Sequence, residues 1–291
     1  MLETLNLKKK LAKPAYSKRI RELQEKLRRL QYAAQEAELP IIVCLEGMDT
    51  SGRGQVIKKL TERLDPRLYR IYPGRPPTVL EQRYHFLWRY QVLLPNDGEM
   101  ALFDHSWYGR VLVERCDKLV KKRVWRQAYP QINEFERWLV DDKQVLVKLW
   151  LHISKKEQKE RFRDSLADPL LRWKITKEYK RHHRQYNRWV QAAEEMLART
   201  STAHAPWTVI EANDLRWARV RVFETLVERI EQAVARRRTQ PAAVSRTTAA
   251  AAATKKDREV RAARDSRRAR EEEEKTEATA LEPVPAAPDR E

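Results

Sequence analysis

The chain has 291 residues, enough for one α/β domain with a remainder, and its formal net charge is +18. Such an excess of positive charge does not help folding but attracts polyanions: nucleic acid, an anionic membrane or a phosphate chain. The two cysteines, Cys44 and Cys116, lack CxxC spacing, which argues against a metal knuckle or a disulfide framework. No apolar run has the length of a transmembrane helix or a signal peptide, so we expect a cytoplasmic protein without membrane contact.

The chain divides into three zones. Residues 1–38 are basic, and apolar side chains at helical spacing predict one amphipathic helix that packs on the domain: Ile20, Leu23, Leu27 and Leu30. Residues 39–235 are predicted to form the folded domain. Residues 236–291 hold an alanine run, mixed charges and several prolines but almost no large apolar side chains. Such a segment cannot bury enough surface to offset the entropy of ordering, so we expect a disordered tail.

The middle zone alternates between strand and helix signals. Apolar runs predict strands at residues 41–45, 100–104, 145–153 and 207–211, and a weaker signal predicts a fifth at 69–72. The run at 41–45 is continuous, which is typical of a strand buried on both faces. Two capping boxes, Thr78 with Glu81 and Ser154 with Glu157, mark helix starts, and the first predicts a helical segment over residues 82–94. This alternation predicts a parallel sheet with helices on both faces.

A candidate phosphate-binding loop follows the first predicted strand, in the sequence EGMDTSGRG at residues 46–54. Gly47 and Gly52 have the spacing of a P-loop, in which glycine lets backbone amides approach phosphate oxygens and the next helix adds its dipole. The usual Lys and Ser/Thr are replaced by Arg53 and Gly54. Arg53 can offer a bidentate fork to phosphate, whereas Gly54 cannot ligate Mg²⁺, so Asp49 is the candidate ligand inside the loop. The alternative is an ordinary glycine-containing turn.

A second acidic position, Asp104, ends the predicted strand 100–104, where a metal-binding Walker-B-like aspartate is expected. The alternative role is a helix N-cap. If the two strands are neighbours, Asp49 and Asp104 lie at the carboxyl edge of the sheet, where open α/β folds bind ligands. Two carboxylates at this edge suit Mg²⁺, which takes oxygen ligands.

Basic residues surround these carboxylates in the sequence. Transfer of a phosphoryl group needs cations around its oxygens, and a basic segment at about residues 108–130 is predicted to act as a lid. The candidate phosphate contacts, each more often a surface charge when taken alone, are Arg75, His105, Arg110, Arg115, Lys121 and Lys122. Four other histidines show no metal-ligand spacing, and no special role is predicted for them: His152, His182, His183 and His204.

Taken together, these motifs resemble the polyphosphate kinase 2 family. The loop at residues 46–54 is similar to the family pattern EGxDxxGKGG, FDHSWY at 103–108 to FDRSWY, and VER at 113–115 to its VERV lid. Pro77, Thr78 and Glu81, the stretch FLWR at 86–89, KLWLHIS at 148–154 and APW at 205–207 follow in the family's order. The resemblance extends over about residues 15–232.

The resemblance implies a P-loop kinase-like three-layer sandwich with a parallel sheet and a helical lid. It implies Mg²⁺-dependent phosphoryl transfer between inorganic polyphosphate and a nucleoside mono- or diphosphate, in a homo-oligomer. Asp49 would be the catalytic and metal-binding acid, Arg53 would replace the Walker lysine, and Asp104 would be the Walker B carboxylate. Arg110 and Arg115 would be the lid arginines. The net charge of +18 fits a polyphosphate channel.

Three positions depart from the family pattern: Arg53 replaces a lysine, His105 replaces an arginine, and Ser165 stands where an arginine is expected. Losing one charged donor at such a site costs roughly 10²–10³ in rate. A second hypothesis is therefore a weak or inactive protein that binds polyphosphate or nucleotide without turnover. A third, nucleic-acid binding, has only the charge in its favour, because no helix-turn-helix, zinc-finger or RNA-recognition signature is present.

Overall fold

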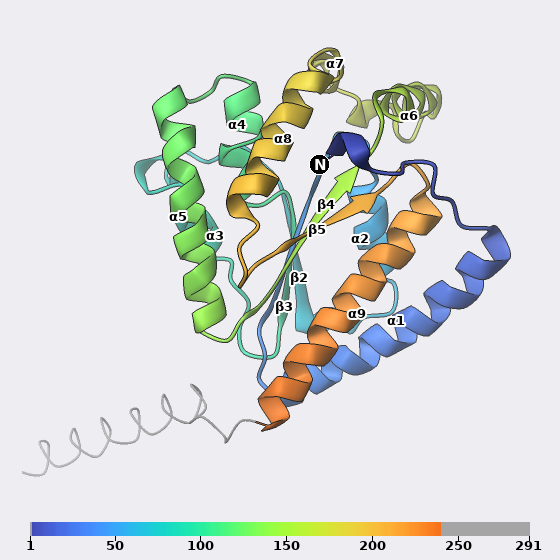
Figure 1. The fold of residues 1–291 in the computed structure, drawn as a ribbon, viewed down its shortest axis with the longest axis vertical. Helices are drawn as coiled ribbons and strands as arrows, with labels where there is room; N and C mark the ends of the chain where they lie inside the picture. Colours follow the sequence, from blue (N-terminus) through green and yellow to red (C-terminus); the bar gives the residue numbers. More distant parts are fainter. Residues whose placement is uncertain (1, 240–291) are drawn as a thin grey trace, which may run out of the picture. The chain divides into compact units, whose positions relative to one another are not determined.

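A five-stranded parallel sheet forms the centre of the fold (Figure 1). The computed structural model describes residues 2–239, apart from the side chain of Lys174. The strands are β1 (Ile41–Gly47), β2 (Tyr69–Pro73), β3 (Met100–Asp104), β4 (Val145–His152) and β5 (Trp207–Glu211). Their spatial order is β2-β3-β1-β4-β5, and each neighbouring pair is parallel. All five predicted strands are confirmed, and β1 and β3 are neighbours.

Helices cover both faces of this sheet. Their bounds are α1 (Lys13–Glu36), α2 (Arg53–Thr61), α3 (Trp88–Gln91), α4 (Val113–Cys116), α5 (Lys122–Asp141), α6 (Lys155–Ala167), α7 (Lys177–Arg184), α8 (Tyr186–Thr200) and α9 (Leu215–Thr239). Helices α1, α2 and α9 lie on one side of the sheet, and α5 and α8 lie on the other (Figure 1). The predicted three-layer α/β architecture is thus confirmed. Among the described residues, no helix combines the length and apolar character needed to cross a membrane.

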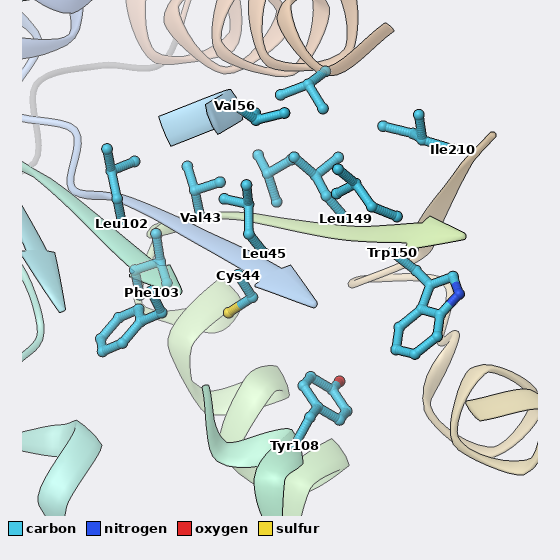
Figure 2. Close-up of a cluster of buried hydrophobic side chains, with 14 of the residues drawn as sticks. Val43, Cys44, Leu45, Val56, Leu102, Phe103, Tyr108, Leu149, Trp150 and Ile210 are labelled. Atoms are coloured by element: carbon cyan, nitrogen blue, oxygen red, sulfur yellow. The ribbon is translucent and has the colours of Figure 1, made fainter. Parts of the chain in front are cut away.

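Alternating side chains of the central strands pack into the two halves of the core, one on each face of the sheet. Every residue of β1 is buried, as expected for a strand covered by helices on both faces. Figure 2 shows Val43 and Leu45 on the side of Val56 from α2, whereas Cys44 lies on the side of Tyr108. Because side chains alternate across a strand, each central strand is fixed against both helical layers at once. This packing holds the carboxyl ends of β1 and β3 in register, with Leu45 opposite Asp104.

The predicted helix over residues 82–94 is wrong in its extent. The capping box forms, since Glu81 N–H donates to Thr78 Oγ1 at 3.2 Å and Thr78 N–H donates to Glu81 Oε2 at 2.8 Å. Only a 3₁₀ turn at Glu81–Arg83 and the short helix α3 follow. The segment instead packs on the core with an irregular backbone, and its Tyr90 ring lies 6.0 Å from that of Phe103 in β3.

The two ends of the described chain pack against each other. The predicted N-terminal helix is present as α1, which begins at Lys13 and packs on α9. Helix α9 ends at Thr239, beyond the predicted domain boundary at residue 235. Its last turns are held because Val234 is buried and Arg237 donates to the carbonyl oxygen of Ala37 at 3.3 Å. The rest of the predicted tail, residues 240–291, lies outside the described residues.

Candidate active site

The loop between β1 and α2 has the conformation expected of a phosphate-binding turn. Gly52, the N-cap of α2, has φ 100°, and a Cβ there would overlap the Leu215 side chain. A Cβ on Gly47 would lie 2.5 Å from the carbonyl oxygen of Leu151. Gly54 differs, because a Cβ at this position would meet nothing within 4 Å. Glycine is therefore required by the fold at Gly47 and Gly52 but not at Gly54.

Three side chains, from helices α2 and α6, hold the carbonyl oxygens of this loop. Arg53 donates to the carbonyls of Gly47 at 2.7 Å and Met48 at 3.2 Å. From α6, Gln158 donates to the carbonyl of Asp49 at 3.2 Å, and Arg161 donates to that of Thr50 at 2.9 Å. The first amides of α2 have no acceptor within their own helix, so this end of the helix can bind an anion.

Arg53 lies at the centre of a network between β1, the loop and β3. Its Nε–H donates to Asp104 Oδ1 at 2.8 Å, and Nη2 lies 2.5 Å from His105 Nε2. Because a guanidinium only donates, His105 accepts through Nε2 and donates its Nδ1–H to Glu46 Oε2 at 3.0 Å. With the two loop carbonyls, these contacts use four of the five N–H groups of Arg53. Arg53 therefore anchors the loop to Asp104, and a bidentate fork to phosphate would require some of these contacts to break.

The charges in this network stabilise one another. Burial alone raises the pKa of the Asp104 carboxyl, but the charge of Arg53 and its hydrogen bond outweigh burial and hold that pKa below its ordinary value. Burial alone lowers the pKa of Arg53, and Asp104 more than compensates, so the pKa of Arg53 is raised. The pair is consequently ionised at neutral pH.

Asp49 is bound by a residue for which the sequence predicted no special role. His182 of α7 places Nδ1 at 2.7 Å from Asp49 Oδ2 and Nε2 at 3.1 Å from Asp117 Oδ2. Burial alone lowers the pKa of His182, but the hydrogen bonds and charges of the two aspartates raise it above its ordinary value. Arg181 also binds Asp117, at 2.7 Å. Helix α7 is thereby attached to the phosphate-binding loop, beyond the end of the sheet toward which β4 points (Figure 1).

The remaining predicted site residues lie outside this network. Arg75 pairs with Glu81 at 2.6 Å, Arg110 with Glu114 at 2.8 Å, and Arg115 with Glu195 at 2.8 Å. Lys121 is the N-cap of α5, and Lys122 is its first residue; both side chains are exposed. The fold thus brings Gly47, Gly52, Arg53, Asp104 and His105 into one cluster. Of the five other predicted cations, the three arginines pair with glutamates elsewhere and the two lysines are exposed.

The two aspartates offer the donor type that Mg²⁺ takes. The described hydrogen bonds reach Oδ2 of Asp49 and Oδ1 of Asp104, which leaves one oxygen of each carboxylate for another ligand. Residues 2–239 contain no cluster of three or more His, Cys, Asp or Glu side chains suited to a metal. Mg²⁺ is commonly bound by one or two carboxylates together with waters and substrate phosphates.

Sequence reasoning missed three residues that hold this site. Glu46 is fully buried and accepts from the Ser106 amide at 2.7 Å, so it ties the end of β1 to the turn after β3. Arg161 and His182 act from the helices that follow β4. Glu46 precedes the glycine motif directly, which was an available signal. His182 lies 133 positions from Asp49, and no local pattern connects the two residues.

The sheet order, the glycine turn and the two carboxylates define a P-loop α/β protein. A sequence profile for "Polyphosphate kinase 2 (PPK2)" matches residues 10–238, and the chain belongs to this family. It is 39% identical over 236 residues to a polyphosphate:AMP phosphotransferase of Pseudomonas syringae pv. tomato, covering 81% of this chain and 47% of that protein.

Two further proteins extend the comparison. An NDP-polyphosphate phosphotransferase of Ruegeria pomeroyi is 34% identical over 76% of this chain and 72% of its own length. The crystal structure of a polyphosphate kinase 2 from Pseudomonas aeruginosa superposes with a TM-score of 0.79 at 39% identity, covering 81% of this chain and 51% of that one. The chain thus spans about half the length of the Pseudomonas relatives that it matches.

Proposed function

We propose that this chain transfers a phosphoryl group between inorganic polyphosphate and a nucleoside mono- or diphosphate. The observation that carries the proposal is the pair of carboxylates, Asp49 in the loop after β1 and Asp104 at the end of the adjacent strand β3. The family membership and the names of its relatives, which give AMP and NDP with polyphosphate, support the substrate class. The net charge of +18 suits a long polyanion.

The proposed roles follow from the contacts. The amides at the start of α2, with Gly47, Gly52 and Gly54, would receive phosphate oxygens, and Asp49 and Asp104 would hold Mg²⁺. Mg²⁺ would supply positive charge to the phosphoryl oxygens during transfer. Arg53 keeps Asp104 in place and has one N–H left for substrate.

The lid cations would complete the phosphate site. Arg110 and Arg115 follow β3 in the chain and pair with glutamates, so phosphate can replace a carboxylate without leaving either guanidinium unpaired. Arg75, His105, Lys121 and Lys122 would line the path of polyphosphate. We further propose that the active form is a homo-oligomer in the cytoplasm.

A second candidate function is binding without efficient turnover. It is favoured by the hydrogen bonds of Arg53, because four of its five N–H groups donate to protein acceptors and are not free for substrate. In this case polyphosphate would bind in a salt-sensitive manner but product would not form.

Product analysis separates the two candidates. Purified protein is mixed with long-chain polyphosphate, Mg²⁺ and each of AMP, ADP, GMP and GDP, and nucleotides are resolved by chromatography. Phosphorylated nucleotide made by the wild type and lost in Asp49→Asn supports the transferase and identifies its acceptor. Salt-sensitive polyphosphate binding without product from any acceptor supports the binding protein.

A further inference from the structure

His182 joins two acidic segments that are far apart in the sequence. Its Nδ1 lies 2.7 Å from Asp49 in the phosphate-binding loop, and its Nε2 lies 3.1 Å from Asp117, the C-cap of α4. The side chain is about nine-tenths buried, with 10% of its surface exposed. Trp189 of α8 packs against the imidazole, with ring centroids 4.5 Å apart. The imidazole is therefore fixed on three sides.

The hydrogen bonds define what His182 gives to Asp49. Both partners of the ring are carboxylate oxygens, which only accept when ionised, so each ring nitrogen donates. Asp117 is in turn held by both Nε and Nη2 of Arg181, at 3.2 and 2.7 Å. A continuous series of hydrogen bonds thus runs from Arg181 through Asp117 and His182 to Asp49.

These hydrogen bonds restrict the orientation of the Asp49 carboxylate, which is the proposed ligand of the cation. The backbone carbonyl of Asp49 is held by Gln158, and its Oδ2 is held by His182. The described hydrogen bonds leave Oδ1 for a cation. Residues that hydrogen-bond a ligating carboxylate set its orientation, and their loss commonly costs about 10–100-fold in metal affinity or activity.

We propose that His182 is a positioning residue for Asp49. It fixes Oδ2 so that Oδ1 is presented to the divalent cation. Because His182 lies on α7, the packing of this helix on the loop is part of the cation site. The proposal rests on the proposed function, because it assigns Asp49 to cation binding during phosphoryl transfer.

Two substitutions separate hydrogen bonding from packing. His182→Asn retains an N–H donor near the position of Nδ1 but loses the ring, whereas His182→Phe retains a ring beside Trp189 but cannot donate. We expect His182→Phe to lower kcat by about 10–100-fold and to raise the Mg²⁺ concentration needed for half-maximal rate, with little change in the KM for nucleotide. His182→Asn should retain clearly more activity than His182→Phe. Lys180→Ala, an exposed change on the same helix, is the matched control and should behave as the wild type.

A binding measurement makes the test independent of turnover. Mn²⁺, as a substitute for Mg²⁺, is titrated into each variant with ADP present, and the free ion is followed by electron paramagnetic resonance. We expect His182→Phe to weaken Mn²⁺ binding by about 10–100-fold, and His182→Asn to weaken it less. Asp49→Asn should abolish the site.

The outcomes distinguish this inference from the proposed function. Equal or better Mn²⁺ binding and activity in His182→Phe than in His182→Asn would overturn the positioning role and leave packing as the function of His182. Mn²⁺ binding that is weakened by Asp49→Asn and His182→Phe, in a wild-type protein that makes no product, would retain the positioning role and refute the phosphoryl transfer.

Discussion

Replacing Arg53 by lysine keeps the positive charge of the site but removes the guanidinium fork. Arg53 is 8% exposed and donates one hydrogen bond to Asp104, one to His105 and two to loop carbonyls. An ammonium has three N–H groups on one atom, so at least one of these four acceptors loses its partner. A hydrogen bond involving a charged group contributes about 1.5–3 kcal/mol, so Arg53→Lys should lower the free energy of unfolding by this amount.

Urea unfolding at pH 7 measures this loss. The matched control is Arg163→Lys on α6, whose side chain is 77% exposed and pairs only with the adjacent Asp164. A surface change of this kind should alter the free energy of unfolding by no more than about 0.5 kcal/mol. If Arg53→Lys and Arg163→Lys unfold at the same urea concentration with equal slopes, the anchoring role of Arg53 is refuted.

Three further predictions concern stability. Burial lowers the pKa of His152 to about 4, below its ordinary value near 6.5, so the unfolded chain binds a proton that the folded chain does not between these values. The free energy of unfolding should therefore fall as the pH falls through this window, by up to about 3 kcal/mol at pH 4. In urea titrations at pH 7 and 4.5, His152→Leu should remove this part of the loss. Lys148→Met leaves the buried Glu136 without its cation, which lies at 2.7 Å, and should cost about 3–5 kcal/mol, whereas adding Glu136→Gln should restore part of that stability. Gly54→Ala should stabilise α2 by about 0.4–1 kcal/mol in thermal melts, because no atom lies within 4 Å of the added Cβ.

Each of these three has a result that contradicts it. A His152→Leu protein with the pH dependence of the wild type would show that His152 is not the group that titrates. A Lys148→Met protein no less stable than the double variant would show that the Glu136 charge is tolerated without its partner. A lower melting temperature for Gly54→Ala would show that Gly54 adopts a conformation that alanine cannot.

The central part of the fold was predictable because it depends on local patterns. The central strand β1 is a continuous apolar run and is buried along its whole length, so its position follows from hydrophobicity. The edge strand β2 is more exposed, and Arg70 interrupts its apolar residues, so its signal in the sequence was weaker. The glycine spacing predicted the tight turn between β1 and α2, where Gly52 has a positive φ. The segment at 82–94 was not predictable, because contacts such as the packing of Tyr90 against Phe103 and Trp107 depend on the folded chain.

The sequence indicated candidate residues for the site but not the contacts between them. Asp49 and Asp104 were proposed from their positions after strands, and Arg53 was expected to face phosphate, whereas in the structure it donates mainly to protein acceptors. His182 was given no role because a single sequence shows nothing that connects it to Asp49 or Asp117. Its partners lie 133 and 65 positions away, and only the packing of α7 on the loop brings them together.

Transfer of labelled phosphate tests the central claim most directly. Polyphosphate labelled with ³²P is incubated with the protein, Mg²⁺ and unlabelled AMP or ADP, and radioactivity in the nucleotide is measured over time. We predict that label enters the nucleotide with the wild-type chain and that Asp49→Asn and Asp104→Asn each abolish the transfer without unfolding the protein. Label that stays in polyphosphate with every acceptor, in a folded wild-type protein that binds both substrates, would contradict the proposed phosphoryl transfer.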